Sequence, residues 1–279
     1  MGRDLWRLDD KIVVVSGAAG GGIGTAITQL CASVGATVIA ADHDAEKLDR
    51  DIAPLIDQGL AVVPVVADVL TEQGVAAVMD GAHGAKGDLH GLVTVVGGGP
   101  PATWGSTPKL SREHWSAQIA LNLDSMFFMA QAFTDALKTQ GRPGAIVAIS
   151  SILGLTASPY NAGYGAGKAA LLSVVKTLGL EFARDGIRVN AVAPGATQTP
   201  TAHLSADPQA VKRGVPMGRF GTPEEIAGPV LFLLSEMSSY MTGQCLVADG
   251  GCNIKWSHLT EDNVPMFLKE QSAEQARKW

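Results

Sequence analysis

Tyr164 and Lys168 stand four residues apart in the segment Tyr-Gly-Ala-Gly-Lys, and Ser151 precedes them in the chain. If this segment is helical, positions i and i+4 share one face, so a phenol and an ammonium point into the same space. A nearby cation favours the phenolate and lowers the tyrosine pKa from its ordinary value of about 10. Such a tyrosine can exchange a proton with an alcohol or a ketone. A packed tyrosine beside a solvated lysine is the alternative, so the interpretation depends on the surrounding motifs.

Size and composition describe a globular protein with a well-buried core. The chain has 279 residues, of which 46% are hydrophobic and 17% are charged, which suits one large α/β domain or two small ones. The net charge of −6 offers no basic surface to nucleic acid or to an anionic membrane. No apolar run reaches the roughly 18 residues of a membrane helix, and the first residues lack the apolar stretch of a signal peptide. Cys31, Cys245 and Cys252 lack metal-ligand spacing, so we expect reduced thiols, no metal and a cytoplasmic location.

Short apolar runs alternate with longer amphipathic stretches. The runs are rich in Val, Ile and Ala, which is typical of strands covered on both faces of a parallel sheet. The pattern predicts an α/β fold with a doubly wound parallel sheet of about seven strands and helices on both faces. The expected strands are 12–15, 37–41, 61–66, 92–96, 145–149, 187–192 and 245–247, and the expected helices are 23–34, 44–58, 71–84, 111–140, 161–184 and 222–236. No linker interrupts them, so we assign 1–251 to one dinucleotide-binding catalytic domain and 252–279, with a polar tail at 270–278, to a C-terminal extension.

A glycine-rich turn, from Ser16 to Gly24, follows the first expected strand and opens the first expected helix. Gly17 and Gly22 allow a tight turn and a close approach of the backbone to a phosphate, and the helix that starts at Ile23 offers free N–H groups to a pyrophosphate. A mere loop is the alternative. The strand before the turn and the helix after it favour a Rossmann-type single domain that binds a dinucleotide.

Four further residues are expected to contact such a cofactor. Asp42 ends the second strand about 20 residues beyond the turn, where a carboxylate accepts hydrogen bonds from the adenosine ribose and repels a 2′-phosphate. His43 rather than Arg follows Asp42, so we favour NAD over NADP, although Asp42 could also be a helix N-cap. Asp68 could bind the adenine amino group, with Val69 packed on the ring, or cap the next helix. Gly97 would let the backbone pass close to the cofactor, unless it belongs to a flexible loop.

In their order along the chain these pieces resemble the short-chain dehydrogenase/reductase family over roughly residues 8–251. No single piece is decisive, whereas the ordered set is highly specific. The resemblance is carried by the glycine turn, Asp42, Asp68-Val69, Asn122, Ser151, Tyr164-x-x-x-Lys168, Asn190, Pro194-Gly195, Thr199 and the segments 219–227 and 242–251.

The resemblance implies roles for four catalytic residues. Tyr164 would be the general acid/base, and Lys168 would lower its pKa and bind the nicotinamide ribose, so both also count as cofactor contacts. Ser151 would orient and polarise the substrate oxygen. Asn122 would hold a water that links Lys168 to solvent as a proton relay. Hydride transfer belongs to the cofactor, so the protein must bind, orient and manage one proton.

Two neighbours could be mistaken for catalytic residues. The family's spacing to the tyrosine selects Ser151 rather than Ser150. Tyr160 has no lysine four residues further on, and we expect it to line the substrate pocket instead.

The resemblance also implies nicotinamide contacts after the sixth strand. Pro194 and Gly195 open this loop, the backbone at Thr197 would contact the carboxamide, and the Thr199 hydroxyl would meet the carboxamide or a phosphate. Two departures from the family's pattern stand out. Four residues rather than three separate Gly17 from Gly22, and Thr94-Val95-Val96-Gly97 replaces Asn-Asn-Ala-Gly. Thr94, which we include among the cofactor contacts, keeps one hydroxyl, so we expect an altered hydrogen-bond pattern and intact chemistry.

Substrate selectivity is expected in the loops 100–106, 153–163 and 196–219, and in the tail, because such folds bind ligands at the carboxyl ends of their strands. Their apolar side chains favour a hydrophobic secondary alcohol or ketone, with cyclic compounds among the candidates; these side chains are Trp104, Leu153, Leu155, Tyr160, Met217 and Phe220. Lys212, Arg213 and Arg219 give weaker support to a 3-oxoacyl-thioester reductase. A non-catalytic nucleotide-binding regulator is the remote alternative. Residues 200–215 show little periodicity, which suggests a lid.

Assembly is implied by the resemblance alone. Family members pair through the two long helices, here 111–140 and 161–184, and form tetramers through the last strand. We therefore expect a homodimer or a homotetramer.

Overall fold

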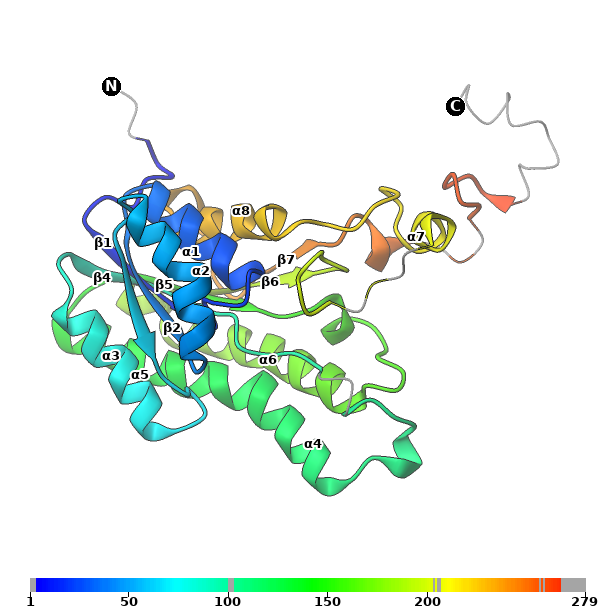
Figure 1. The fold of residues 1–279 in the computed structure, drawn as a ribbon, viewed down its shortest axis with the longest axis horizontal. Helices are drawn as coiled ribbons and strands as arrows, with labels where there is room; N and C mark the ends of the chain where they lie inside the picture. Colours follow the sequence, from blue (N-terminus) through cyan, green and yellow to red (C-terminus); the bar gives the residue numbers. More distant parts are fainter. Residues whose placement is uncertain are drawn as a thin grey trace.

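The computed structural model describes residues 4–99, 103–202, 204, 207–255, 257 and 259–266. Its centre is one sheet of seven strands in the order β3-β2-β1-β4-β5-β6-β7, and every neighbouring pair is parallel (Figure 1). The predicted doubly wound sheet is therefore confirmed. The strands are β1 Lys11–Ser16, β2 Thr37–Asp42, β3 Val62–Val66, β4 Asp88–Thr94, β5 Gly144–Ile149, β6 Ile187–Pro194 and β7 Cys245–Ala248.

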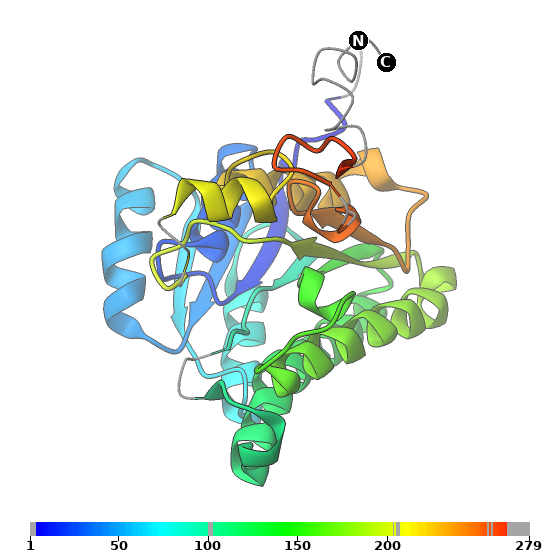
Figure 2. The ribbon, with the colours of Figure 1, turned by 90° about the vertical axis from the view of Figure 1, so that its right-hand side faces the viewer.

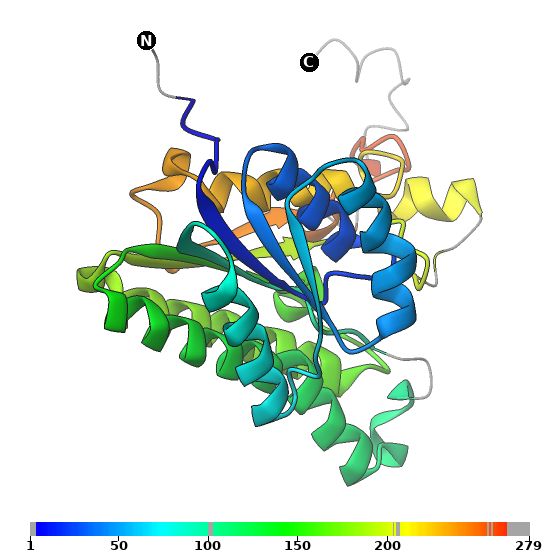
Figure 3. The same ribbon diagram turned by 60° about the vertical axis from the view of Figure 1, so that its left-hand side comes forward.

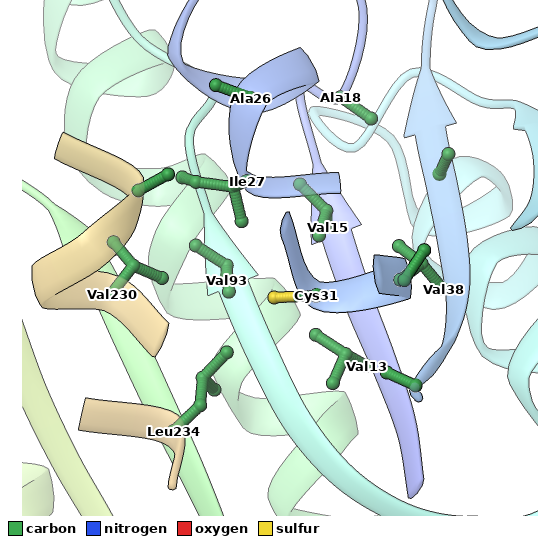
Figure 4. Packing of buried hydrophobic residues seen from close by; sticks show 14 of the residues in the cluster. Val13, Val15, Ala18, Ala26, Ile27, Cys31, Val38, Val93, Val230 and Leu234 are labelled. Carbon is green, nitrogen blue, oxygen red and sulfur yellow. The ribbon is translucent and has the colours of Figure 1, made fainter. Parts of the chain in front are cut away.

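Helices cover both faces of this sheet, and alternate residues of one strand explain why. Successive side chains of a strand point to opposite faces. Val13 and Val15 of β1 pack in one core with α1, α2 and α8 (Figure 4), whereas Ile12 and Val14 pack in a second core with α3, α5 and α6. Figure 3 shows these two layers on either side of the strands. The helices are α1 Ile23–Ser33, α2 Ala45–Asp57, α3 Glu72–Gly84, α4 Arg112–Ile119, α5 Ser125–Gln140, α6 Ala162–Glu181, α7 Pro208–Gly214 and α8 Pro223–Leu234, with short 3-10 turns at Thr107–Lys109, Ile152–Gly154, Ala183–Asp185, Glu236–Ser238 and Cys252–Ile254.

The expected strand 92–96 is wrong by several residues, because β4 runs from Asp88 to Thr94. Polar residues at its start have partners that let them join the sheet. Asp88 pairs with Lys11 at 3.6 Å, and His90 Nε2 lies 2.9 Å from the carbonyl of Leu234. At the other end the chain turns, since the next two N–H groups both donate to the Ser16 carbonyl.

The expected helix 111–140 contains a π turn, Ala120–Asp124, that separates α4 from α5. One extra residue is accommodated there without a break in the helix, and π turns of this kind concentrate at functional sites.

A helix not predicted from the sequence, α7, lies in the region 200–215. Asp207 starts it by accepting a hydrogen bond from the Gln209 N–H at 2.9 Å, and Pro208 occupies its first turn.

Residues beyond β7 pack against residues 208–216, called here the α7 segment (Figure 2). Lys255 Nζ donates to the Lys212 carbonyl at 3.3 Å, and Asn263 Nδ2 donates to the Pro216 carbonyl at 3.0 Å. The expected polar tail 270–278 lies outside the described residues. Within the described ranges, no helix is both long enough and apolar enough to cross a membrane.

The order of the strands creates a crevice. The chain winds from β1 outward to β3 and then returns to add β4 to β7 on the other side of β1. The loops after β1 and β4 therefore leave in opposite directions, and ligands of such sheets bind at this point, outside the carboxyl ends of the strands.

Candidate active site

A cavity of about 800 Å³ lies at the carboxyl edge of the sheet, beside the divergence of β1 and β4. It brings together most of the site residues expected from the sequence. These are Gly17, Gly22, Ile23, Asp42, Asp68, Val69, Gly97, Ser151, Tyr164, Lys168, Pro194, Gly195, Thr197 and Thr199. Segments from the whole length of the domain thus meet at one site.

The glycine turn brings backbone close to backbone. A side chain at Gly17, whose φ is +80°, would place its Cβ 2.9 Å from the Val96 nitrogen, so a larger residue does not fit. Helix α1 then begins at Ile23. Its N-cap, Gly22, provides no side-chain cap, and its first turn has no acidic residue. Its N–H groups and its dipole therefore suit a pyrophosphate.

Asp42 lies at the far end of the cavity with its carboxylate held by two amides. The Ala19 N–H donates to Oδ2 and the Asp44 N–H donates to Oδ1, each at 3.2 Å. The N-cap of α2 is Asp44, whose Oδ1 accepts from the Lys47 N–H at 3.1 Å. The capping alternative for Asp42 is therefore set aside, and its carboxylate is left facing the cavity.

Asp68 is not a helix N-cap either. Helix α3 is capped by Thr71, whose hydroxyl accepts from the Gly74 N–H at 3.0 Å. Asp68 accepts instead from the Leu70 N–H at 3.0 Å and lines the cavity beside Val69.

Sequence reasoning missed a charged group at this end of the cavity. His43, Lys47 and Arg50 line it as well, and Asp51 contacts the glycine turn through the Gly20 N–H at 2.7 Å. The spacing of 47, 50 and 51 in a helix that follows Asp42 was the available signal, since such positions share one helix face.

At the other end of the cavity, Tyr164 lies beside Ser151. Burial raises the pKa of the Tyr164 phenol above its usual value, and a hydrogen bond with the Ser151 side chain acts in the opposite direction. Lys168 Nζ lies 5.9 Å from the centroid of the Tyr164 ring. The expectation that Lys168 lowers this pKa is thus not met in the structure, because burial of the phenol outweighs the other influences.

Lys168 itself is deeply buried, with 2% of its surface exposed. Its Nζ donates to the Ile149 carbonyl at 2.8 Å, and burial lowers the pKa of the ammonium to about 8. A Cβ added at Gly97 would lie 2.6 Å from Nζ and 2.9 Å from Asn122 Oδ1. Because Gly97 has no side chain, the loop after β4 can pack closely against both Lys168 and Asn122.

Asn122 does not line the cavity but stands directly behind its wall, inside the π turn. Its side chain pairs with Gly98 in both directions, accepting from the N–H and donating to the carbonyl at 2.9 Å. Gln118, missed in the sequence, fixes the amide further, since its Oε1 accepts from Asn122 Nδ2 at 3.0 Å and its Nε2 donates to Thr103 at 2.8 Å. Gln118, one helical turn earlier, and Gly98 of the loop after β4 thus hold the asparagine in one orientation.

The residues weighed against Ser151 and Tyr164 have other surroundings. Ser150 is buried, and its hydroxyl donates to the Lys168 carbonyl at 3.1 Å, which ties β5 to α6. Tyr160 is 66% exposed, has a φ of +62° and does not line this cavity. Thr94 is also absent from the cavity wall. Its hydroxyl is buried beside Ser16 of β1 without a hydrogen-bond partner, because the strand register points both side chains into the interior.

The loops expected to select the substrate carry apolar side chains on an open surface. Trp104, Leu155 and Met217 are all exposed, and none of them lines the cavity. Leu153 and Phe220 are partly buried and lie outside the cavity wall too. Pro100, Pro101 and Ala102 of the first loop lie outside the described residues.

The arrangement combines a cavity of about 800 Å³ with a phenol, a hydroxyl and a buried ammonium at one end. Such a set can hold a dinucleotide and move one proton at a substrate oxygen. Within the described residues, no group of three or more His, Cys, Asp or Glu side chains is placed to hold a metal ion.

Comparison with known proteins identifies the family. A family model described as Enoyl-(Acyl carrier protein) reductase matches residues 17–253. The chain is 38% identical to 3-oxoacyl-(acyl-carrier-protein) reductase FabG of Thermotoga maritima over 248 residues, covering 88% of this chain and 98% of that protein. The chain belongs to the short-chain dehydrogenase/reductase family. It is therefore an oxidoreductase of a family that uses a nicotinamide cofactor.

Two further relatives act on cyclic compounds by name. Cis-4-hydroxycyclohexanecarboxylate dehydrogenase of Sinomonas cyclohexanicum is 36% identical, with 87% of this chain and 96% of that protein covered. A solved structure of 7α-hydroxysteroid dehydrogenase complexed with NADH and 7-oxo glycochenodeoxycholic acid superposes with a TM-score of 0.83 at 28% identity, covering 90% of this chain and 98% of the other.

Proposed function

We propose that this protein is an NAD-dependent oxidoreductase that interconverts a hydrophobic, cyclic secondary alcohol and its ketone. One observation carries the proposal. Ser151, Tyr164 and Lys168 converge at one end of a cavity whose other end presents the carboxylate of Asp42. It supports the proposal because the groups proposed to transfer the proton and the group proposed to bind the ribose both line one cleft of about 800 Å³.

When bound, the nicotinamide cofactor would accept or supply the hydride. The chain's own residues would manage the proton. Tyr164 exchanges a proton with the substrate oxygen, and Ser151 hydrogen-bonds both that oxygen and the phenol. Lys168 contributes a buried positive charge at the same end of the cleft. The lowered pKa of Lys168, about 8, also makes its proton more available near neutral pH.

Asn122 is proposed to link Lys168 to solvent through a water. The support is its place inside the π turn, directly behind Gly97, where a side chain would touch both Lys168 Nζ and Asn122 Oδ1. Gln118 Oε1 accepts a hydrogen bond from the asparagine amide and holds its orientation.

NAD rather than NADP is proposed because of Asp42. Its carboxylate accepts hydrogen bonds from ribose hydroxyls and repels a 2′-phosphate. Kinetic constants measured with both nucleotides decide the point, and a preference for NADP would overturn this part of the proposal.

The substrate class rests on two kinds of support. Relatives named for hydroxysteroid and cyclohexanecarboxylate chemistry are similar to this chain over most of its length. The loops at the mouth of the cleft also expose apolar side chains, among them Trp104, Leu155 and Met217. A screen of alicyclic, steroidal, aryl and acyl-thioester alcohols with NAD identifies the compound.

A 3-oxoacyl-thioester reductase is the second candidate, favoured by the 38% identity to FabG. The basic residues that first suggested it are partly neutralised within the chain. Arg219 pairs with Glu225 through two hydrogen bonds of 2.7 and 2.6 Å, and Arg213 approaches Glu261 at 3.4 Å. Reduction of acetoacetyl thioesters without activity on cyclic ketones would establish this second candidate instead.

Replacing the proposed general acid/base tests the function directly. Tyr164→Phe removes the hydroxyl, so turnover of the substrate found in the screen should fall by at least about 10²-fold. Calorimetry should show that NAD binding survives. Tyr160→Phe is the matched control, because Tyr160 is exposed and outside the cavity, and it should keep wild-type turnover. Near-normal turnover by Tyr164→Phe would refute the assignment of Tyr164 as general acid/base. If the wild type binds the nucleotide but turns over none of the compounds, the non-catalytic regulator is indicated instead.

Other features are proposed on the same footing. Residues 1–251 form the catalytic domain and 252–279 an extension of it, supported by the contacts of Lys255 and Asn263 with the α7 segment. Three free cysteines fit a cytoplasmic location, and burial raises the pKa of the Cys31 thiol to about 12, which keeps it unreactive.

A further inference from the structure

Two consecutive amides of the glycine turn are held by carboxylates from two different elements. The Ala19 N–H donates to Asp42 at the end of β2 at 3.2 Å, and the Gly20 N–H donates to Asp51 of α2 at 2.7 Å. The first contact involves the residue already expected to select the cofactor. The second involves a residue that neither the sequence pattern nor the fold assigns to any role.

Gly20 and Gly21 accommodate the additional residue of this turn. Both have left-handed backbones, with φ of +101° and +63°, and a Cβ at Gly20 would meet nothing within 4 Å. A Cβ at Gly21 would lie 3.3 Å from Pro200 and 4.0 Å from Asp51. The longer turn therefore reaches across to α2, and Asp51 fixes it there.

Asp51 also forms an ion pair with Arg50. Arg50 binds the Asp51 carboxylate with two nitrogens, Nε at 2.8 Å and Nη2 at 2.7 Å. The Asp51 side chain is 12% exposed, whereas Arg50 is 62% exposed and lines the cavity. The Arg50 hydrogen bonds and the Gly20 N–H hold the pKa of Asp51 below its usual range, so the carboxylate is ionised at neutral pH.

A phosphate on the adenosine ribose would need a cation and N–H donors at this end of the cleft. Here the Gly20 N–H and the Arg50 guanidinium are both bound to Asp51, which adds a negative charge of its own. We propose that Asp51 is a second specificity-determining residue that, together with Asp42, excludes a 2′-phosphorylated nucleotide. This inference rests on the proposed use of NAD.

The proposal is tested by nucleotide binding, which needs no substrate. Calorimetry with NAD and with NADP gives the ratio of the two dissociation constants for each variant. Asp51→Asn keeps an oxygen for the Gly20 N–H, removes the charge and releases Arg50. The NADP/NAD ratio of dissociation constants should fall by at least about tenfold, the effect of a modest change in charge interaction. Adding Arg50→Ala to Asp51→Asn should reverse most of that gain.

Matched variants separate this effect from a change of net charge. Asp49→Asn removes the same charge from an exposed position of the same helix that does not line the cavity, and it should leave the ratio unchanged. Melting temperature reports folding, and Asp51→Ser, which also keeps an oxygen acceptor, replaces Asp51→Asn if that variant is unfolded.

The outcomes are distinguishable. Tighter binding of NADP than of NAD by the wild type overturns the proposed cofactor and this inference together. A wild type that prefers NAD, with an unchanged ratio in both Asp51 variants, overturns only the role of Asp51. An equal shift in Asp49→Asn assigns the effect to net charge and overturns it as well.

Discussion

At the level of single residues, burial of Lys168, a proposed catalytic group, has a cost in stability. Its ammonium is almost fully buried, and the structure shows a carbonyl, that of Ile149, as its hydrogen-bond partner. Among the described residues, no carboxylate lies within ion-pair distance of it. A buried charge without an opposite charge destabilises a folded protein, and such groups concentrate at functional sites.

Replacing this lysine should therefore stabilise the protein while abolishing activity. Burial lowers the Lys168 pKa from 10.5 to about 8, a shift that corresponds to roughly 3 kcal/mol. The cost is fully present below pH 8, where the folded protein must carry the charge, and it is lost as the pH rises towards 10.5, where the unfolded chain also becomes neutral. Lys168→Met should gain most stability at pH 7 and least near pH 10 in denaturant titrations.

Lys176→Met is the control for that series, because Lys176 lies on the same helix and is exposed. Its effect on stability should be small at both pH values. A gain for Lys168→Met that does not depend on pH would contradict the explanation by a buried charge.

At the scale of elements, the close approach of α6 to the π turn fixes the geometry of the site. A Cβ at Gly167 would lie 2.9 Å from the Cβ of Asn122, and a Cβ at Gly163 would lie 2.8 Å from that of Gln118. Both contacts are shorter than real side chains tolerate. The glycines of α6 thus let the helix bearing Tyr164 and Lys168 pack directly on the segment that holds Asn122.

Gly167→Ala should disturb both stability and catalysis. The added methyl group must displace the backbone near Asn122, which should cost about 1–3 kcal/mol of unfolding free energy, as overpacking usually does. Turnover should fall further than the loss of folded protein explains, because Asn122 moves with its helix. Thermal denaturation and kinetics at a temperature where the variant is folded measure the two effects.

Gly228→Ala provides the contrast on α8. A Cβ there would meet nothing within 4 Å, so alanine should stabilise the helix by roughly 0.5–1 kcal/mol and leave turnover unchanged. Equal behaviour of the two variants would show that packing between α6 and the π turn is not the cause.

At the scale of the whole molecule, exposed apolar side chains mark two faces. Phe127 and Phe128 of α5 form an edge-to-face pair with ring centroids 5.5 Å apart, and Leu180 of α6 is 82% exposed. At the sheet edge, Val247 of β7 is exposed, and Tyr240 is fully exposed. Apolar side chains gathered on a surface often mark interaction sites, and these two regions are those expected to pair family members.

Charge placed on one face should reduce the assembly to a smaller species. The wild type is expected to sediment as a dimer or a tetramer. Phe128→Glu introduces a charge on the α5 face, so it should break contacts through the long helices and leave at most a dimer formed through β7. Tyr240→Glu is the corresponding change at the other face. A wild type that sediments only as a monomer would contradict the expected assembly.

The order of elements and most residues of the candidate site could be predicted from the sequence. Hydrophobic periodicity is a local property, so it places strands and helices, and the glycine turn, Asp42 and the pair Tyr164 and Lys168 are each written in a few neighbouring residues. The family resemblance then predicted which of these residues meet, and the cavity contains nearly all of them.

Only the tertiary structure decided how these groups affect one another. Burial depends on neighbours from distant segments, so the raised pKa of Tyr164 and the lowered pKa of Lys168 were not visible in their spacing. The same reason hid Asp51, whose contact with Gly20 joins residues 31 positions apart. Two cofactor contacts predicted for β4 and its loop also had different outcomes. Thr94 points away from the cavity because of the strand register, whereas Gly97 lines its wall. The local sequence specifies which chemical groups are present. Tertiary packing sets how far each group lies from its neighbours, how much solvent reaches it and which charges surround it.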